Sequence, residues 1–288
     1  MKLSPWILAA RPITLVASII PIISSMLILP HGAFKTIIFI WTLIAAIIIQ
    51  VVTNYINDLL DFIKGADENR VGPKRMLQAG LITKNQMKKT IIWLTCIGII
   101  SGIPLVIQGG LSIVIIGLSA FLFAYLYTGG PYPLAYNGLG DIFVFIYFGI
   151  IAVLGSYFLQ TGHIDINAIY LAMGLGAKNV LLLIINNIRD YQTDKLVSKK
   201  TLIVLCGILF GKIQAVLMLF ISYLSIYLLA LNFEQFSIFY ISLLSLPLTA
   251  TIINDIFYKQ GILLNKTLLK VSSLLIIDCI LLYIGIVI

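Results

Sequence analysis

Charged residues are scarce in this sequence of 288 residues. They make up 10% of the chain, whereas hydrophobic residues make up 60%, and the mean hydropathy is +1.08. A soluble domain carries about 25% charged residues, so this chain has too few to cover a surface that faces water. Disordered chains are rich in charge and poor in apolar residues, and disorder is therefore excluded as well. The composition leaves a membrane protein.

Cysteine and histidine are also few, which bears on metal and redox chemistry. Cys96, Cys206 and Cys279 lie far apart in apolar stretches and form no metal-binding or redox spacing. His31 and His163 fall in short loops and are too few for a metal site. We interpret the cysteines as packing residues.

The alternation of apolar and polar residues that marks a transmembrane β-barrel is missing. Stretches such as 180–185 and 274–288 are almost continuously apolar. A transmembrane helix needs about 20 apolar residues, and breaks divide the chain into nine such segments. We therefore predict an all-α fold, a polytopic transmembrane bundle of nine helices that forms one domain over residues 1–288. The expected spans are 12–30, 37–60, 88–107, 111–128, 139–160, 167–188, 208–231, 236–257 and 269–288.

The basic residues are distributed unevenly between the two ends of these spans. Seventeen of the 19 lie before the first span or in the connections 61–90, 189–212 and 258–270. Basic loops of membrane proteins face the cytoplasm. We expect the N-terminus and these three loops in the cytoplasm and the C-terminus outside, in a multi-pass protein of the cell (plasma) membrane. The net charge of +8 then reflects topology, and no nucleic-acid partner is expected.

Six of the 11 acidic residues form two clusters, namely Asp58, Asp61, Asp67 and Glu68, and then Asp190 and Asp194. Asn54, Asp58 and Asp61 are spaced i, i+4 and i+7, which places them on one face of a helix. The second cluster follows Asn186 with the spacing i, i+4 and i+8. Each cluster ends an apolar span and opens a basic loop. We expect two helices to present an amide and two carboxylates each at the cytoplasmic membrane boundary, where the active site would lie.

Carboxylates this close together repel one another and need a cation. Oxygen ligands without histidine or cysteine suit a hard ion such as Mg²⁺, with Mn²⁺ or Ca²⁺ as substitutes. Mg²⁺ usually takes one or two carboxylates and completes its shell with water and substrate phosphates. Basic residues beside the acids would suit the rest of an anionic group: Lys64, Arg70, Lys74, Arg75, Arg189, Lys199 and Lys200. The pattern predicts a diphosphate held at the membrane surface.

Isolated polar residues have a simpler interpretation. Asp165, Glu234, Asp255 and Asp278 are expected to be solvated, the last two slightly buried. Polar residues inside a membrane are costly and usually functional, which favours a functional role for the two matching clusters. Lys178 lies deep in a span with no acid one turn away, so it would either pair with another helix or touch substrate.

The two clusters resemble the paired aspartate-rich motifs of the UbiA superfamily of intramembrane aromatic prenyltransferases, whose fold is a bundle of nine transmembrane helices. Four further blocks carry the resemblance: RPITL at 11–15, RVGPKRMLQAGLIT at 70–83, YTGGPYPLAYNGLGD at 127–141, and KKT at 199–201 after the second motif. They are most similar to the 1,4-dihydroxy-2-naphthoate polyprenyltransferases and cover the chain from residue 6 to 207. Ser198 departs from the pattern, which usually has glycine there.

The resemblance implies Mg²⁺-dependent transfer of a polyprenyl group from polyprenyl diphosphate to 1,4-dihydroxy-2-naphthoate with decarboxylation, which gives demethylmenaquinol in bacterial menaquinone biosynthesis. Asp58, Asp61, Asp190 and Asp194 would hold the metal. Lys64, Arg75, Arg189 and Lys199 would bind the diphosphate, helped by Asn54, Asn57 and Asn186. Tyr127 would stabilise the allylic cation through the face of its ring.

Two alternatives stay open. A related prenyltransferase could use another aromatic acceptor, such as 4-hydroxybenzoate or homogentisate, although Gly129 and Gly130 stand where enzymes of the 4-hydroxybenzoate type commonly have a basic pair. A secondary transporter would also carry polar groups in the membrane. It usually shows internal repeats with broken helices near the midplane, and this sequence shows no obvious repeat. The prenyl chain length and the residue that handles the proton are not determined by these patterns.

Overall fold

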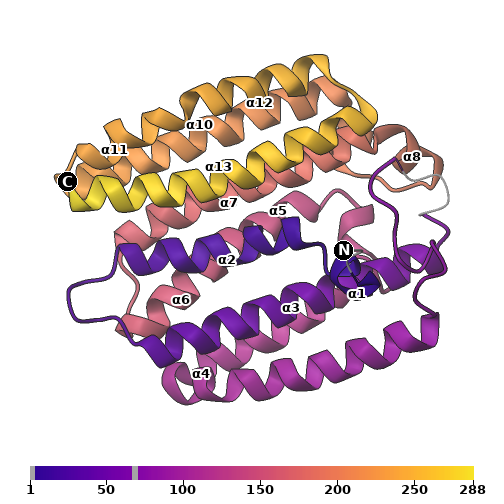
Figure 1. Ribbon diagram of the computed structural model, residues 1–288, viewed down its shortest axis with the longest axis horizontal. Coiled ribbons are helices and arrows are strands. Elements are labelled where there is room, and N and C mark those ends of the chain that lie inside the picture. The colour runs from indigo at the N-terminus through magenta and orange to yellow at the C-terminus, as the bar shows by residue number, and fades with distance from the viewer. Residues whose placement is uncertain (1–3, 67–70) are drawn as a thin grey trace.

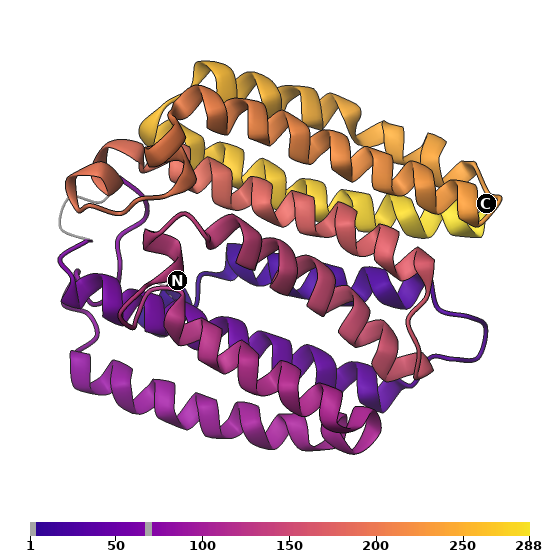
Figure 2. The same ribbon diagram turned by 180° about the vertical axis from the view of Figure 1, so that it is seen from behind.

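The computed structural model describes residues 4–66 and 71–288, and all regular structure in these residues is helical (Figure 1). The long helices run side by side in one bundle, with the N- and C-termini at opposite ends (Figures 1 and 2). The predicted all-α membrane bundle is confirmed at this level. Seven helical segments are long and apolar enough to cross a membrane: Thr36–Ile63, Lys84–Leu126, Gly140–Thr161, Ile166–Arg189, Ile208–Asn232, Ser237–Tyr258 and Gly261–Val287.

These segments correspond to named elements of the bundle. The long helices are α3 (Thr36–Ile63), α4 (Lys84–Leu126), α7 (Ile166–Arg189), α10 (Ile208–Asn232) and α13 (Leu264–Val287). The fifth predicted span consists of α5 (Gly140–Phe145), the π-helical η2 (Ile146–Ile151) and α6 (Ala152–Thr161), and the eighth of α11 (Ser237–Ser242), η3 (Leu243–Ser245) and α12 (Leu246–Tyr258). The shorter elements are α1 (Pro5–Ala9), α2 (Pro12–Leu27), η1 (Leu134–Tyr136), α8 (Tyr191–Leu196), α9 (Leu202–Cys206) and η4 (Gly261–Leu263).

Two features explain why seven segments correspond to nine predicted spans. Helix α4 contains the third and fourth predicted spans and kinks at Gly110, whose φ of 64° and ψ of −150° are not helical. Glycine tolerates this conformation because it has no Cβ. Helix α2, the first predicted span, has only 16 residues. Helix α4 also begins earlier than predicted, because Thr83 and Gln86 cap it reciprocally.

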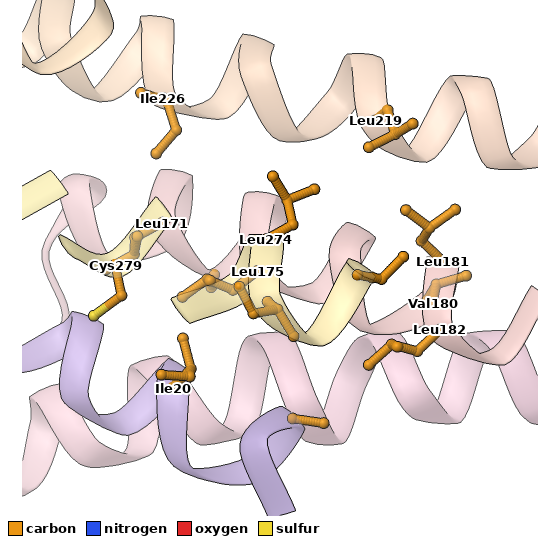
Figure 3. Close-up of a cluster of buried hydrophobic side chains, with 14 of the residues drawn as sticks. Ile20, Leu171, Leu175, Val180, Leu181, Leu182, Leu219, Ile226, Leu274 and Cys279 are labelled. Atoms are coloured by element: carbon orange, nitrogen blue, oxygen red, sulfur yellow. The ribbon is translucent and has the colours of Figure 1, made fainter. Parts of the chain in front are cut away.

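Helix α7 forms the centre of the bundle and is the most buried of the seven segments. Side chains of α7, such as Leu175 and Leu181, pack against Leu219 of α10, Leu274 of α13 and Ile20 of α2 (Figure 3). Small residues let neighbouring helices approach closely in a membrane. One such close approach joins η2 to α7, where a Cβ on Gly149 would lie 2.5 Å from the Cα of Gly176.

The connection after α3 decides where the first acidic cluster faces. Its residues Met76, Leu77 and Ile82 are buried against Tyr55 and Leu59 of α3. The connection therefore folds back over the last turns of the helix. The ends of α3 and α7, together with α1 and α8, lie at the same end of the bundle (Figure 1).

Candidate active site

A cavity of about 440 Å³ lies where the ends of α3 and α7 meet. We call it the polar cavity. Its polar lining is Arg11, Thr14, Asn57, Asp58, Asp61, Lys74, Arg75, Tyr127, Thr128, Tyr136, Asp141, Asn186, Asn187, Arg189, Asp190, Lys199, Thr201 and Asn265. The structure thus brings Asp58 and Asp61 of the first cluster and Asp190 of the second, more than 120 residues apart in the chain, into the lining of one space.

The α3 wall is built from the first cluster and the connection that folds back over it. Asp58 is 1% exposed and accepts a hydrogen bond of 3.3 Å from the backbone N–H of Met76. Asp61 forms an ion pair with Arg75 at 3.3 Å and accepts a hydrogen bond of 2.9 Å from the hydroxyl of Tyr136. The hydrophobic packing of the connection therefore places a cation beside these carboxylates.

On the α7 wall, as on the α3 wall, carboxylates are paired with basic side chains. Arg189 donates from Nε and Nη2 to the two carboxylate oxygens of Asp190, at 2.8 and 2.7 Å. Its third nitrogen, Nη1, donates to Asn265 Oδ1 of α13 at 2.8 Å. Asp194, on α8, pairs with Lys199 at 3.3 Å. A fork of this kind is a strong, geometrically specific pair, so the guanidinium is held in one orientation.

The predicted single helical face for Asn186, Asp190 and Asp194 is wrong. Helix α7 ends at Arg189, and Asp190 has a φ of −93° and a ψ of 7° before α8 begins. This change of direction carries Asp194 behind Lys199, outside the lining of the polar cavity. Arg189 pairs with Asp190 at the turn itself, and Lys199, which follows α8, pairs with Asp194 of that helix.

Nine of the twelve predicted site residues line the polar cavity: Asn57, Asp58, Asp61, Arg75, Tyr127, Asn186, Arg189, Asp190 and Lys199. Lys64 and Asn54 lie beside it. The ammonium of Lys64 donates to the carbonyl of Thr128 and lies 4.3 Å from the ring centre of Tyr136. Burial lowers the pKa of Lys64 below its ordinary value, although the charge of Asp61 acts in the opposite direction.

Asn54 contacts the N-terminal segment of the chain. It is buried, and its Nδ2 donates to the carbonyl of Ala10 at 2.8 Å and to Thr14 Oγ1 at 3.0 Å. These contacts fix the turn between α1 and α2. Arg11 lies in this turn, directly before Pro12, and its backbone is in the left-handed region with a φ of 52°. Asn54 therefore holds the backbone next to a residue that lines the polar cavity. Asp67, Glu68 and Arg70 lie outside the described residues.

Several cavity residues were not predicted from the sequence: Arg11, Thr128, Tyr136, Asp141, Asn187 and Asn265. Arg11, Tyr136 and Asp141 lie within the blocks that carry the family resemblance, so these blocks could have indicated them as candidate site residues. Asn265 had none, because it lies in the connection 258–270, beyond the blocks that carry the resemblance. It reaches the site because α13 packs beside α7 (Figure 1).

A second cavity of about 460 Å³ continues from Tyr127 into the bundle. We call it the apolar cavity. Its walls come from α2, α3, α4, α5, η2 and α6 and are almost entirely hydrophobic, with Phe121, Phe123 and Phe143 among them. Tyr127 lines both cavities and is therefore their boundary. Burial raises the pKa of Tyr127, and the charge of Asp141 raises it further.

The donor set of the polar cavity fits a hard cation. Asp58, Asp61 and Asp190 supply carboxylate oxygens, and Asn57 and Asn186 supply amide groups. Among the described residues, no three acidic, histidine or cysteine side chains gather closely enough to hold one ion. Mg²⁺ commonly binds one or two carboxylates and takes its other ligands from water and phosphate. Each wall supplies one or two carboxylates, which is the number that Mg²⁺ commonly binds.

The fold and the two cavities define a multi-pass membrane protein in which a cavity lined by carboxylates and basic side chains adjoins an apolar one. The UbiA prenyltransferase family matches residues 18–262, and the chain belongs to this family. It is therefore a prenyltransferase, and the predicted resemblance is confirmed.

Individual relatives agree with this assignment. The chain is 33% identical to the 1,4-dihydroxy-2-naphthoate octaprenyltransferase of Haemophilus influenzae, over 86% of this chain and 84% of that one. It is 36% identical to the protein of the same name from Escherichia coli, over 70% and 68% of the two chains. A UbiA homologue from Archaeoglobus fulgidus bound to GPP and Mg²⁺ has the same fold, with a TM-score of 0.71 and 16% identity over 97% of this chain and 99% of that one.

Proposed function

We propose that this chain transfers a polyprenyl group from polyprenyl diphosphate to 1,4-dihydroxy-2-naphthoate, with loss of carbon dioxide and diphosphate, to give demethylmenaquinol in menaquinone biosynthesis. The junction of the polar and apolar cavities at Tyr127 carries the proposal. A prenyl diphosphate has a charged head and a long apolar chain, and the two cavities match these parts. The names of the relatives that are 33% and 36% identical support the acceptor.

The polar cavity would hold the diphosphate head. Asp58 and Asp61 on one wall, and Asp190 with Asp194 behind it on the other, would bind Mg²⁺, for which Mn²⁺ is a possible substitute. When bound, the metal neutralises the charge of the leaving diphosphate. Arg75, Arg189 and Lys199 pair with these carboxylates. They would then turn to the phosphate oxygens, because each cation needs a new anionic partner.

The remaining predicted residues have roles that follow from their positions. Asn57 and Asn186 line the polar cavity and would orient phosphate or metal-bound water. Lys64 lies above Tyr136 at the edge and would meet the outer phosphate. Asn54 would act on the diphosphate indirectly, through the turn that presents Arg11.

The apolar cavity would take the first isoprene units of the chain. This arrangement places the reacting carbon next to Tyr127, whose ring face can stabilise the allylic cation. Burial favours the neutral phenol at Tyr127. The surrounding hydrophobic walls exclude water, which would otherwise quench the cation.

The whole chain would form one domain, 1–288, with nine membrane spans. Helix α2 and the two halves of α4 on either side of Gly110 bring the seven segments to that number. The basic connections lie at the end of the bundle that holds the polar cavity, so this end would face the cytoplasm of a bacterial cell. The substrates would enter from that side and from the bilayer.

The test uses purified protein in lipid nanodiscs with Mg²⁺, a series of prenyl diphosphates, and three acids: 1,4-dihydroxy-2-naphthoate, 4-hydroxybenzoate and homogentisate. Mass spectrometry should find a prenylated, decarboxylated product from the naphthoate. Removal of Mg²⁺ by EDTA, or the substitution Asp58→Asn or Asp190→Asn, should lower turnover at least about 100-fold, because charge stabilisation of this kind supplies several kcal/mol. Asp165→Asn, which keeps the cap of α7 far from the site, is the matched control.

Each alternative has its own result. A product formed only from another acid would assign the chain to a related prenyltransferase. Solute flux into proteoliposomes without prenyl transfer would favour the transporter. Turnover of more than a few per cent in Asp58→Asn would overturn the metal assignment alone.

A further inference from the structure

Asp141 stands apart from the other acids of the polar cavity. Four described carboxylates line this space, and three of them belong to the two aspartate clusters. Asp141, in the first turn of α5, is the fourth, and it is 7% exposed. Asp61 and Asp190 have an arginine in contact, whereas Asp141 makes no ion pair with any residue that the structure describes.

A neutral side chain holds Asp141 in place. Gln214 of α10 donates from Nε2 to Asp141 Oδ2 at 2.8 Å. The buried Oε1 of Gln214 has no hydrogen-bond partner among the described residues. An orphaned buried acceptor costs free energy, so the amide is kept in this position for the contact with Asp141. Oδ1 of the carboxylate makes no hydrogen bond within the described part of the chain and is left to the cavity it lines.

The position of Asp141 relative to the reacting carbon follows from Tyr127. The hydroxyl of Tyr127 lies 3.3 Å from where a Cβ on Gly140, the residue before Asp141, would be. The charge of Asp141 also contributes to the raised pKa of Tyr127. Tyr127 is the boundary of the two cavities, so Asp141 is beside the point where the diphosphate head meets the apolar chain. An acceptor ring attacking there from the polar cavity would meet this carboxylate.

We propose that Asp141 is the catalytic base that takes the proton of the acceptor's ring hydroxyl as the ring attacks the prenyl carbon. This inference rests on the proposed function. The C–O bond of the allylic diphosphate breaks, and its electron pair leaves with diphosphate. A π pair of the ring forms the new C–C bond, and the O–H pair becomes a C=O bond as the proton moves to the carboxylate. The product of the step is a ring ketone that still carries the acceptor's carboxylate. When the attacking carbon is the one that bears it, the carboxylate leaves as carbon dioxide, and the electron pair of that C–C bond returns to the ring and restores aromaticity.

Other residues of the polar cavity are less suited to this role. The carboxylates of the clusters bind cations, which reduces their basicity. Tyr127 is held as a neutral phenol, because burial raises its pKa. No histidine is among the described residues that line the space. Asp141 combines a carboxylate oxygen without an ion-pair partner among the described residues, a neutral partner in Gln214, and a place in the cavity lining beside Tyr127.

The experiment measures prenyl transfer by wild type and Asp141→Asn with a series of dihydroxynaphthoates that carry electron-withdrawing groups on the distal ring. Asparagine can still accept the hydrogen bond from Gln214 but cannot take a proton. With the unsubstituted acceptor, kcat should fall about 10²- to 10⁴-fold, the usual contribution of general base catalysis. Binding of prenyl diphosphate should be unchanged. The ratio of wild-type to variant rates should approach one as the hydroxyl becomes acidic enough to ionise before the attack.

Two further variants keep the test decisive. Asp141→Glu retains a carboxylate and should recover part of the rate. Gln214→Leu leaves the base without its anchor and should slow transfer about 10-fold or more, also without loss of diphosphate binding. An equal loss across the whole acceptor series, or a loss of diphosphate binding in Asp141→Asn, would show a structural role and overturn the inference. If wild type itself prenylates no naphthoate, the proposed function fails; if both proteins transfer equally well, only the role of Asp141 fails.

Discussion

The ion pair between Lys178 of α7 and Asp278 of α13 leads to a prediction about stability. The two side chains are 4% and 8% exposed, and neither residue lines the polar or the apolar cavity. Lys178 follows Leu175 by three residues on α7, and Asp278 directly precedes Cys279 on α13; Leu175 and Cys279 belong to the central hydrophobic cluster (Figure 3). Asp278 Oδ1 has no hydrogen-bond partner among the described residues. Asp278 therefore relies on Lys178 for compensation of its charge, and the expectation that Asp278 is a solvated residue is wrong.

Lys178→Met should destabilise the fold by about 3–5 kcal/mol, because removal of one partner leaves an uncompensated charge in a buried site. Methionine has a similar length and fills the same space, so the loss measures charge more than packing. In the double variant Lys178→Met/Asp278→Leu both charges are gone. Replacement of a buried pair by apolar residues is often neutral or stabilising by about 1–4 kcal/mol. The double variant should therefore be more stable than Lys178→Met.

The assay is a double-mutant cycle on the purified protein, with unfolding followed in mixed micelles of increasing denaturing detergent. Lys195→Met, at an exposed position of α8, is the control and should change stability by less than about 0.5 kcal/mol. Turnover per folded molecule should be unchanged in the double variant, because neither side chain reaches the site. A loss below about 1 kcal/mol in Lys178→Met, or a double variant less stable than either single one, would refute the reasoning.

Two other predictions concern packing and pH. Gly149→Ala should destabilise the protein by about 1–3 kcal/mol, because its Cβ would meet the backbone of Gly176 at 2.5 Å. Gly155→Ala is the control, because the nearest atom to its Cβ would be 3.9 Å away. Equal stability of the two variants would contradict this account. Burial lowers the pKa of Lys64. Its ammonium is charged below that pKa, so as the pH rises Lys64 loses its positive charge at a lower pH than an ordinary lysine does. The affinity for geranyl diphosphate, measured by calorimetry, should fall on the alkaline side, and Lys64→Arg should move this fall to higher pH; identical profiles would exclude a role for the charge.

Hydropathy predicted most of the bundle because a membrane span is a local property of about 20 residues. The exceptions are also local in cause. The backbone of Gly110 is not helical and separates the two halves of α4, and the 16 residues of α2 start at Pro12. The turn at Asp190 could not be predicted from spacing, because long-range contacts beside it, such as that of Arg189 with Asn265 of α13, form only in the folded chain.

The candidate site divides in the same way. The sequence pattern shows which residue types are concentrated at one end of the spans, because charged residues in an apolar chain are confined to the ends of the membrane-spanning segments. Which of these residues share a cavity depends on how the helices pack. Asn265, Asp141 and Arg11 come from three separate segments and enter the polar cavity because α13, α5 and the α1–α2 turn pack around α7 and α3. Asp194 and Asn54 lie outside its lining because one turn and two hydrogen bonds direct them elsewhere. Such contacts depend on the packing of distant segments, which no local pattern encodes.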